Sequence, residues 1–135
     1  MTVLLTGGAG YIGTHTAVVL LAAGRDVVLL DNLCNSSRDV LGRLQHITGR
    51  SVTLVEADVR DTSRVAQVLR DHACTSVVHF AGLKAVGESV QKPIDYYANN
   101  VQGTVSLLQA MHETGVRSLV FSSSATVYGV PQYLP

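Results

Sequence analysis

Three glycines near the amino terminus constrain the fold of this chain more than any other feature. They form the pattern Gly8-x-Gly10-x-x-Gly13, between an apolar run at residues 3–6 and a helix-like run at residues 11–23. The first N–H groups of such a helix lack partners within it and carry the positive end of its dipole, which suits a diphosphate. We assign the tight turn to Gly8, the approach of the diphosphate to Gly10, and the close packing of helix on strand to Gly13.

An acidic residue follows at the position that a dinucleotide site requires. Asp31 ends the apolar run at residues 26–31, about 20 positions after the glycines. A carboxylate there can accept hydrogen bonds from the adenosine ribose hydroxyls and repels a 2′-phosphate, which predicts NAD rather than NADP. The alternative, a glycine-rich turn followed by a solvated Asp, leaves the joint occurrence of strand, helix, strand and acid unexplained.

Length, charge and cysteine content narrow the class of protein. The chain has 135 residues, with ten basic and ten acidic side chains. One domain is expected, and balanced charge gives no reason to expect a nucleic-acid or membrane partner. Cys34 and Cys74 suggest no disulfide framework, the start carries no basic leader, and no apolar run reaches the roughly 20 residues that cross a bilayer. We therefore expect a cytoplasmic protein, and we interpret Cys34 as a packing residue.

Nearly continuous apolar runs alternate with helix-like segments along the chain. The expected strands are residues 3–6, 26–31, 52–56, 76–80 and 118–122, and the expected helices are residues 11–23, 38–48, 63–72 and 93–114. Strands that are apolar throughout are typical of parallel sheets buried on both faces. The pattern predicts an α/β fold with a Rossmann-type doubly wound parallel sheet of order 3-2-1-4-5 and a ligand crevice between strands 1 and 4.

The last predicted helix and the end of the chain carry two further expectations. The helix has an apolar stripe at helical spacing, formed by Ile94, Tyr97, Ala98, Val101, Val105 and Leu108. The chain stops in a loop just after the fifth strand, where a complete fold of this type continues. We expect residues 1–135 to be an incomplete NAD-binding domain whose carboxy-terminal substrate domain is absent.

Polar and small residues follow the third and fourth strands, where a crevice of this kind collects its ligand contacts. Asp58 can accept a hydrogen bond from an adenine amino group, and Ala81 and Gly82 leave room for a cofactor beside the backbone. Lys84 offers a cation for a phosphate or hydroxyl, although a solvated loop lysine is the alternative. Asp61 has the character of a helix start.

Three further groups have open or structural interpretations. Of the adjacent Asn99 and Asn100, which are poor helix-interior residues, we expect one to face the cofactor and the other to be exposed. His79 is interpreted as a buried, satisfied imidazole. The serines at residues 122–124 form a turn or direct hydroxyls into the crevice, and the residues alone do not choose a reaction.

Four segments in register resemble the extended short-chain dehydrogenase/reductase family. They are TGGAGYIG at residues 6–13, DNLCNS at 31–36, HFAGLKAVGES at 79–89 and FSSSATVYG at 121–129. The last three are most similar to the UDP-hexose 4-epimerase branch of that family. The resemblance implies exchange of UDP-glucose and UDP-galactose with a tightly held NAD, through a 4-keto sugar and a tyrosine base, in galactose metabolism.

The resemblance also assigns site residues. Ser124 is implied to be catalytic, binding the substrate by a hydrogen bond to the reacting oxygen. The implied cofactor-binding residues are Gly7, Gly10, Tyr11, Ile12, Gly13, Asp31, Asn32, Leu33, Cys34, Asn35, Ser36, Asp58, Val59, Phe80, Ala81, Gly82, Leu83, Lys84 and Asn99. No metal is expected, and the full-length protein is expected to be a homodimer.

One family feature is missing from these residues. The family places its catalytic tyrosine four residues before a lysine, and no tyrosine here is followed by lysine at that spacing. The pair would fall beyond Pro135, so we expect this chain alone not to epimerise a sugar, for want of the base and of the cation that lowers its pKa.

The sequence leaves other functions open. Related 4,6-dehydratases carry Asp-Glu where this chain has Ala125 and Thr126, which argues against dehydration. Another NAD-dependent nucleotide-sugar epimerase or a decarboxylase of the family is an alternative. A non-catalytic NAD-binding module is the alternative from another class, and it gives Ser124 no role.

Overall fold

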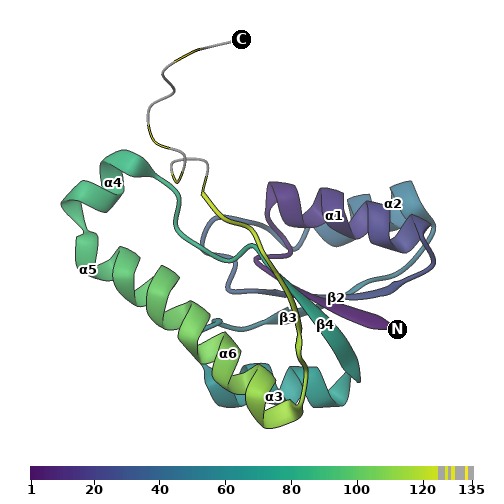
Figure 1. Cartoon of the computed structure of the whole chain (residues 1–135). Helices are drawn as coiled ribbons and strands as arrows, with labels where there is room; N and C mark the ends of the chain where they lie inside the picture. The colour runs from purple at the N-terminus through teal and green to yellow at the C-terminus, as the bar shows by residue number, and fades with distance from the viewer. Residues whose placement is uncertain (125–126, 128, 130–132, 134–135) are drawn as a thin grey trace.

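A five-stranded parallel sheet forms the centre of the computed structural model, which describes residues 1–124, 127, 129 and 133 (Figure 1). Its strands are β1 (Thr2–Thr6), β2 (Asp26–Asp31), β3 (Thr53–Glu56), β4 (Cys74–His79) and β5 (Ser118–Phe121). The order is β3-β2-β1-β4-β5, and every neighbouring pair is parallel. The predicted fold class and strand order are confirmed.

Helices cover both faces of the sheet (Figure 1). One face carries α1 (Tyr11–Ala22) and α2 (Val40–Thr48); the other carries α3 (Thr62–Asp71) and α6 (Gly103–Thr114). Successive strand residues point to opposite faces. Leu4 therefore packs toward α3 and α6, whereas Leu5 packs toward α1 and α2, and both are fully buried. Burial on both faces is the reason that the strands are apolar without alternation.

Two predicted helix starts are present. The Asp61 side chain caps α3 by accepting a hydrogen bond from the Arg64 backbone N–H at 2.9 Å. Pro93 lies in the first turn of α5 (Pro93–Tyr96), where its missing N–H is no loss. Both local signals therefore mark true helix boundaries.

The region of the predicted helix 93–114 differs from the expectation. A short helix, α4 (Val86–Gln91), precedes it, and the six-residue π-helix η1 (Tyr97–Gln102) separates α5 from α6. A six-residue helix is too short to show an amphipathic period, so α4 left no signal in the hydrophobic pattern. The apolar stripe exists but does not face this chain's core, since Ile94 is 81% exposed and Val101 is 54% exposed.

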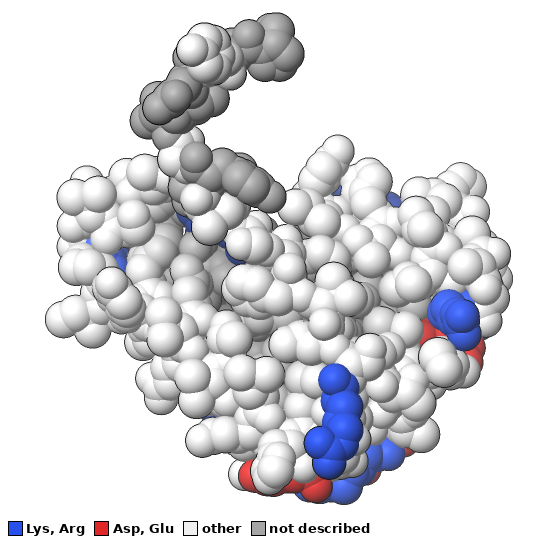
Figure 2. Space-filling model, in the orientation of Figure 1, with Lys and Arg blue, Asp and Glu red and all other residues white. Residues whose placement is uncertain are grey.

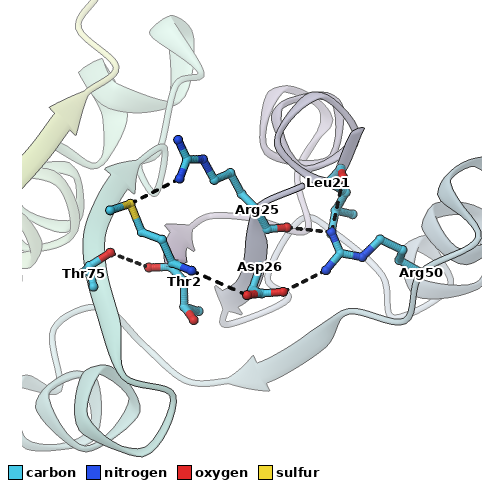
Figure 3. A network of polar contacts seen from close by, with 7 residues as sticks. Thr2, Leu21, Arg25, Asp26, Arg50 and Thr75 are labelled. Carbon is cyan, nitrogen blue, oxygen red and sulfur yellow. Dashed lines mark hydrogen bonds and ion pairs between the residues drawn. The ribbon is translucent and has the colours of Figure 1, made fainter. Parts of the chain in front are cut away.

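A small polar network closes the amino-terminal end of the sheet (Figure 3). The Arg50 guanidinium donates to Asp26 at 2.8 Å and to the carbonyl oxygens of Arg25 and Leu21 at 2.9 and 3.2 Å. These bonds tie the end of α1 to the start of β2. Because the Asp26 and Arg50 side chains are 58% and 39% exposed, the ion pair itself contributes little to stability.

None of the helices in the described part of the chain combines the length and apolar character needed to span a bilayer.

Candidate functional site

A pocket lies at the carboxyl ends of the strands, where the connections from β1 and β4 leave toward opposite faces of the sheet. Its walls come from the segments after β1, β2, β3 and β4, with Asn99 from η1 and Ser122 from the segment after β5. Figure 2 shows a hollowed, largely uncharged surface between the lobe of α4 and the lobe of α1. The position agrees with the crevice predicted between strands 1 and 4.

Most of the predicted cofactor residues meet in this pocket. Those that line it are Gly7, Gly10, Tyr11, Ile12, Gly13, Asp31, Asn32, Cys34, Asn35, Val59, Phe80, Ala81, Gly82, Leu83, Lys84 and Asn99. Leu33, Ser36 and Asp58 are not among the lining residues, whereas Leu30, Ala57 and Ser122 are. Leu30 and Ala57 carry no polar group, so no chemical signal in the sequence marked them.

The structure of the glycine turn differs from the prediction, which assigned the tight turn to Gly8. Gly7, not Gly8, has the left-handed backbone, with φ of +66°. A Cβ on Gly7 would lie 2.6 Å from the backbone N of Ala81, so the turn packs directly on the segment after β4. A Cβ on Gly13 would lie 2.7 Å from the Gly7 carbonyl oxygen, so Gly13 brings α1 against the turn itself.

Asp31 is buried at the end of β2, and both of its carboxylate oxygens accept hydrogen bonds from local donors. One carboxylate oxygen accepts a hydrogen bond from the Ala9 N–H at 3.0 Å. The other accepts from the Leu33 N–H at 2.9 Å and from the Ser36 hydroxyl at 3.0 Å. Leu33 has φ of 58°, which is uncommon for a residue with a side chain. Leu33 and Ser36 thus act on the pocket through Asp31.

Asp58 lies beside the pocket and is held by a neighbour that sequence reasoning missed. Its carboxylate accepts hydrogen bonds from Arg60 Nε at 2.9 Å and Nη2 at 2.8 Å, and from the Asn32 amide at 3.2 Å. The side-chain hydrogen bonds from Arg60, partly opposed by burial, lower the pKa of Asp58 to about 2. The contact to adenine stays a prediction, since Asn32 rather than Asp58 lines the pocket.

The two asparagines of η1 have different tasks. Asn99 lines the pocket, as expected for one of the pair. Asn100 is half-buried rather than exposed, so that part of the expectation is wrong. Its side chain accepts a hydrogen bond from the Leu83 N–H at 2.8 Å and donates to the Leu83 carbonyl at 2.9 Å. An adjacent polar pair in a predicted helix was the available signal.

His79 is a buried imidazole with both ring nitrogens satisfied, as predicted. The residue is 2% exposed and contacts the hydroxyls of Thr6 and Thr104. Burial first, and the nearby Lys84 charge second, lower the pKa of His79 to about 4. The ring is therefore neutral near pH 7.

The cysteines and the serines after β5 complete the set of candidates. Cys34 is exposed and lines the pocket, so its interpretation as a packing residue is wrong; the short segment after β2 leaves it no core to reach. Burial raises the pKa of the Cys74 thiol to about 11.

Of the serines after β5, Ser122 lines the pocket, whereas Ser124 is exposed and its backbone carbonyl accepts a hydrogen bond from the Val127 N–H at 3.2 Å. The predictions on Ala125, Thr126 and Tyr128 lie outside the described residues.

Metal ligation has no support in the part of the chain that the structure describes. No group of three or more His, Cys, Asp or Glu side chains there could hold a metal ion.

The sheet order, the glycine turn and the acid that ends β2 define a Rossmann-type α/β domain with a ligand crevice at its switch point. Residues 3–135 match the model of the NAD dependent epimerase/dehydratase family, and the chain belongs to that family.

Named relatives and solved structures agree with this assignment. The chain is 55% identical to a UDP-glucose 4-epimerase of Klebsiella pneumoniae over 100% of this chain and 97% of that protein. It is 56% identical to the enzyme of that name from Pasteurella multocida, over 100% of this chain but only 40% of that protein.

Two crystal structures of UDP-glucose 4-epimerases superpose closely on the chain. One, from Stenotrophomonas maltophila with bound NAD and formylated UDP-arabinopyranose, has a TM-score of 0.97 and 50% identity. The other, from Bifidobacterium longum in complex with NAD+ and UDP, has a TM-score of 0.95 and 52% identity. The chain is covered completely in both comparisons and spans 40% of each of those longer chains.

Proposed function

We propose that the protein to which this chain belongs is a UDP-glucose 4-epimerase, which interconverts UDP-glucose and UDP-galactose through a 4-keto sugar in galactose metabolism. The pocket at the switch point carries the proposal, because it joins the glycine turn, Asp31 and Lys84 in one crevice. Identities above 50% to enzymes of that name support the choice of reaction within the family. The free thiols of Cys34 and Cys74 agree with a cytoplasmic location.

The residues of the pocket fit NAD. Within the described structure no side chain caps the amino-terminal end of α1, which opens on the pocket at Tyr11 and Ile12, so its backbone N–H groups can receive the diphosphate. The oriented carboxylate of Asp31 can accept a ribose hydroxyl at the oxygen that bonds only Ala9, and its charge can exclude a 2′-phosphate. The cofactor, when bound, supplies a reversible hydride acceptor.

The sugar end of the site is proposed to lie near β5 and the segment after β4. Ser122 and Lys84 line the pocket there. Ser124, two residues beyond Ser122, is proposed to hydrogen-bond the reacting sugar oxygen and to orient its proton toward the base. The tyrosine base and its lysine partner are proposed to follow Pro135 in the intact protein, because no Tyr-x-x-x-Lys occurs among residues 1–135.

Turnover by the intact protein tests this function. We expect conversion of UDP-galactose to UDP-glucose, and release of NAD rather than NADP when the purified protein is denatured with acid. Activity on a different nucleotide sugar would support another epimerase or a decarboxylase of the family. Bound NAD with no turnover of any nucleotide sugar would support a non-catalytic NAD-binding module, and absence of NAD would reject the site itself.

The exposed apolar stripe is proposed to form a homodimer interface. Tyr97, Val101, Val105 and Leu108 are 71%, 54%, 48% and 46% exposed along η1 and α6. Few charged side chains appear on this flank in Figure 2. A contiguous apolar surface of this kind is typical of an interface between proteins.

A charge placed in this stripe is expected to dissociate the dimer. Val101→Glu would force an unpaired carboxylate into the interface, which is strongly unfavourable. Sedimentation velocity on the intact protein should show a dimer for the wild type and a monomer for Val101→Glu. Gln45→Glu on exposed α2 is the matched control and should remain dimeric. A wild-type monomer, or a Val101→Glu dimer of unchanged affinity, would contradict the interface.

A further inference from the structure

We propose that Asn100 is a positioning residue, which sets the pocket wall at residues 81–84 and is itself held by a hydrogen-bond chain that begins at Thr6 and His79 in the core. The proposal rests on the NAD site proposed above and deepens it, because it concerns how that wall is held before a ligand arrives.

The contact between Asn100 and the wall is made entirely to backbone. The Asn100 amide accepts from the Leu83 N–H at 2.8 Å and donates to the Leu83 carbonyl at 2.9 Å. A side chain that uses both of its polar ends on one residue fixes the position and the orientation of that residue. Leu83 lies between Gly82 and Lys84, and all three line the pocket.

The surroundings of Gly82 show how closely the pocket wall packs against Asn100. A Cβ built on Gly82 would lie 3.3 Å from Asn100 Oδ1 and 3.2 Å from Lys84 Nζ. The amide oxygen and the ammonium group therefore approach Gly82 together. Movement of Asn100 would change the place from which Lys84 reaches into the pocket.

At the other end of this hydrogen-bond chain, the donor and the acceptor of each hydrogen bond can be assigned. The Thr104 hydroxyl donates its one hydrogen to the backbone carbonyl oxygen of Asn100 at 2.7 Å. Its oxygen must then accept from His79 Nε2, which lies 3.1 Å away. In the neutral ring Nδ1 is consequently an acceptor, and the Thr6 hydroxyl of β1 donates to it. The chain runs from the central strand of the sheet, through β4 and α6, to the pocket wall.

The π-helix makes this arrangement possible. Asn99 and Asn100 are consecutive, yet Asn99 lines the pocket while Asn100 contacts Leu83. The Asn99 amide also donates to Asn100 Oδ1 at 2.9 Å, so the two side chains lie together on the crevice side of η1. Single π turns occur frequently at functional sites, and here the turn places Asn99 at the cavity and the adjacent Asn100 against the backbone of the cavity wall.

The test is NADH binding by the intact protein after its resident NAD has been removed, followed by fluorescence of the bound reduced cofactor. Asn100→Leu removes both hydrogen bonds to Leu83 with little change in volume, and should weaken NADH binding about tenfold and shift the emission of the saturated complex. Thr104→Val breaks the chain one step earlier and should weaken binding about threefold. Gln102→Leu, an exposed residue of the same π-helix, is the matched control and should match wild type.

The outcomes separate the two proposals. If wild type itself binds no NADH, the proposed function fails. If wild type binds and the folded Asn100→Leu protein matches it in affinity and emission, the positioning role is overturned even when the variant unfolds at a lower temperature. If Asn100→Leu does not fold, Thr104→Val decides by the same two measurements, and wild-type values for it would overturn the role. An equal loss in Gln102→Leu would also overturn it.

Discussion

Gly7→Ala is expected to destabilise the protein by about 3 kcal/mol and to abolish NAD binding at micromolar concentrations. Two effects add at this position. The backbone has φ of +66°, where a Cβ is strained, and that Cβ would lie 2.6 Å from the backbone N of Ala81. Backbone atoms on a neighbouring strand connection cannot move aside as a flexible side chain can, so the glycine turn must separate from the segment after β4.

Gly49→Ala is the matched control for this substitution. Gly49 ends α2 with φ of +68°, but apart from adjacent parts of the chain, a Cβ there would meet no described atom within 4 Å. The variant should therefore lose only the conformational term, about 1 kcal/mol, and should keep NAD binding. Urea unfolding and calorimetry with NAD measure both quantities. Equal losses of stability in the two variants would show that close packing between the turn and Ala81 is unimportant.

Acidification is expected to remove about 3 kcal/mol of stability between pH 6.5 and pH 4 through His79 alone. Burial and the Lys84 charge lower its pKa from 6.5 to about 4 in the folded protein. Over that interval the unfolded chain binds a proton that the folded protein does not, so the unfolding free energy falls as pH falls. The contribution of Asp58, whose pKa is lowered from 3.8 to about 2, is lost mainly below pH 4 and so overlaps this interval only slightly.

Urea unfolding at several pH values between 7 and 4.5 measures the effect. His79→Gln should be less stable than wild type at pH 7, because its hydrogen bonds to Thr6 and Thr104 change, but should lose less stability on acidification. His46→Gln on exposed α2 should follow the wild-type pH dependence. An unchanged slope for His79→Gln would mean that His79 is not the group that titrates.

The parts of the site that depend on spacing along the chain could be predicted from the sequence. The glycine turn, Asp31 and the strand ends were predicted because spacing along the chain fixes them once parallel strands are assigned. The task of Gly7 was given to Gly8, because the sign of φ depends on how the turn meets Ala81, a contact across the sheet. The contacts of Asn100 with Leu83 and of Arg60 with Asp58 were not predicted for a similar reason: each depends on a position that only the tertiary fold determines.

The pocket has two halves of separate origin. Its glycine turn and Asp31 belong to the first crossover, whereas Lys84, Asn99 and Ser122 belong to the segments around β4, η1 and β5. Because the side chains of the second half lie on later segments of the chain, we expect that substitutions among them can alter the chemistry performed while the glycine turn and Asp31 continue to bind the same dinucleotide. With such a division, proteins that share this fold can differ in the reaction they catalyse while they keep the same residues for binding the coenzyme.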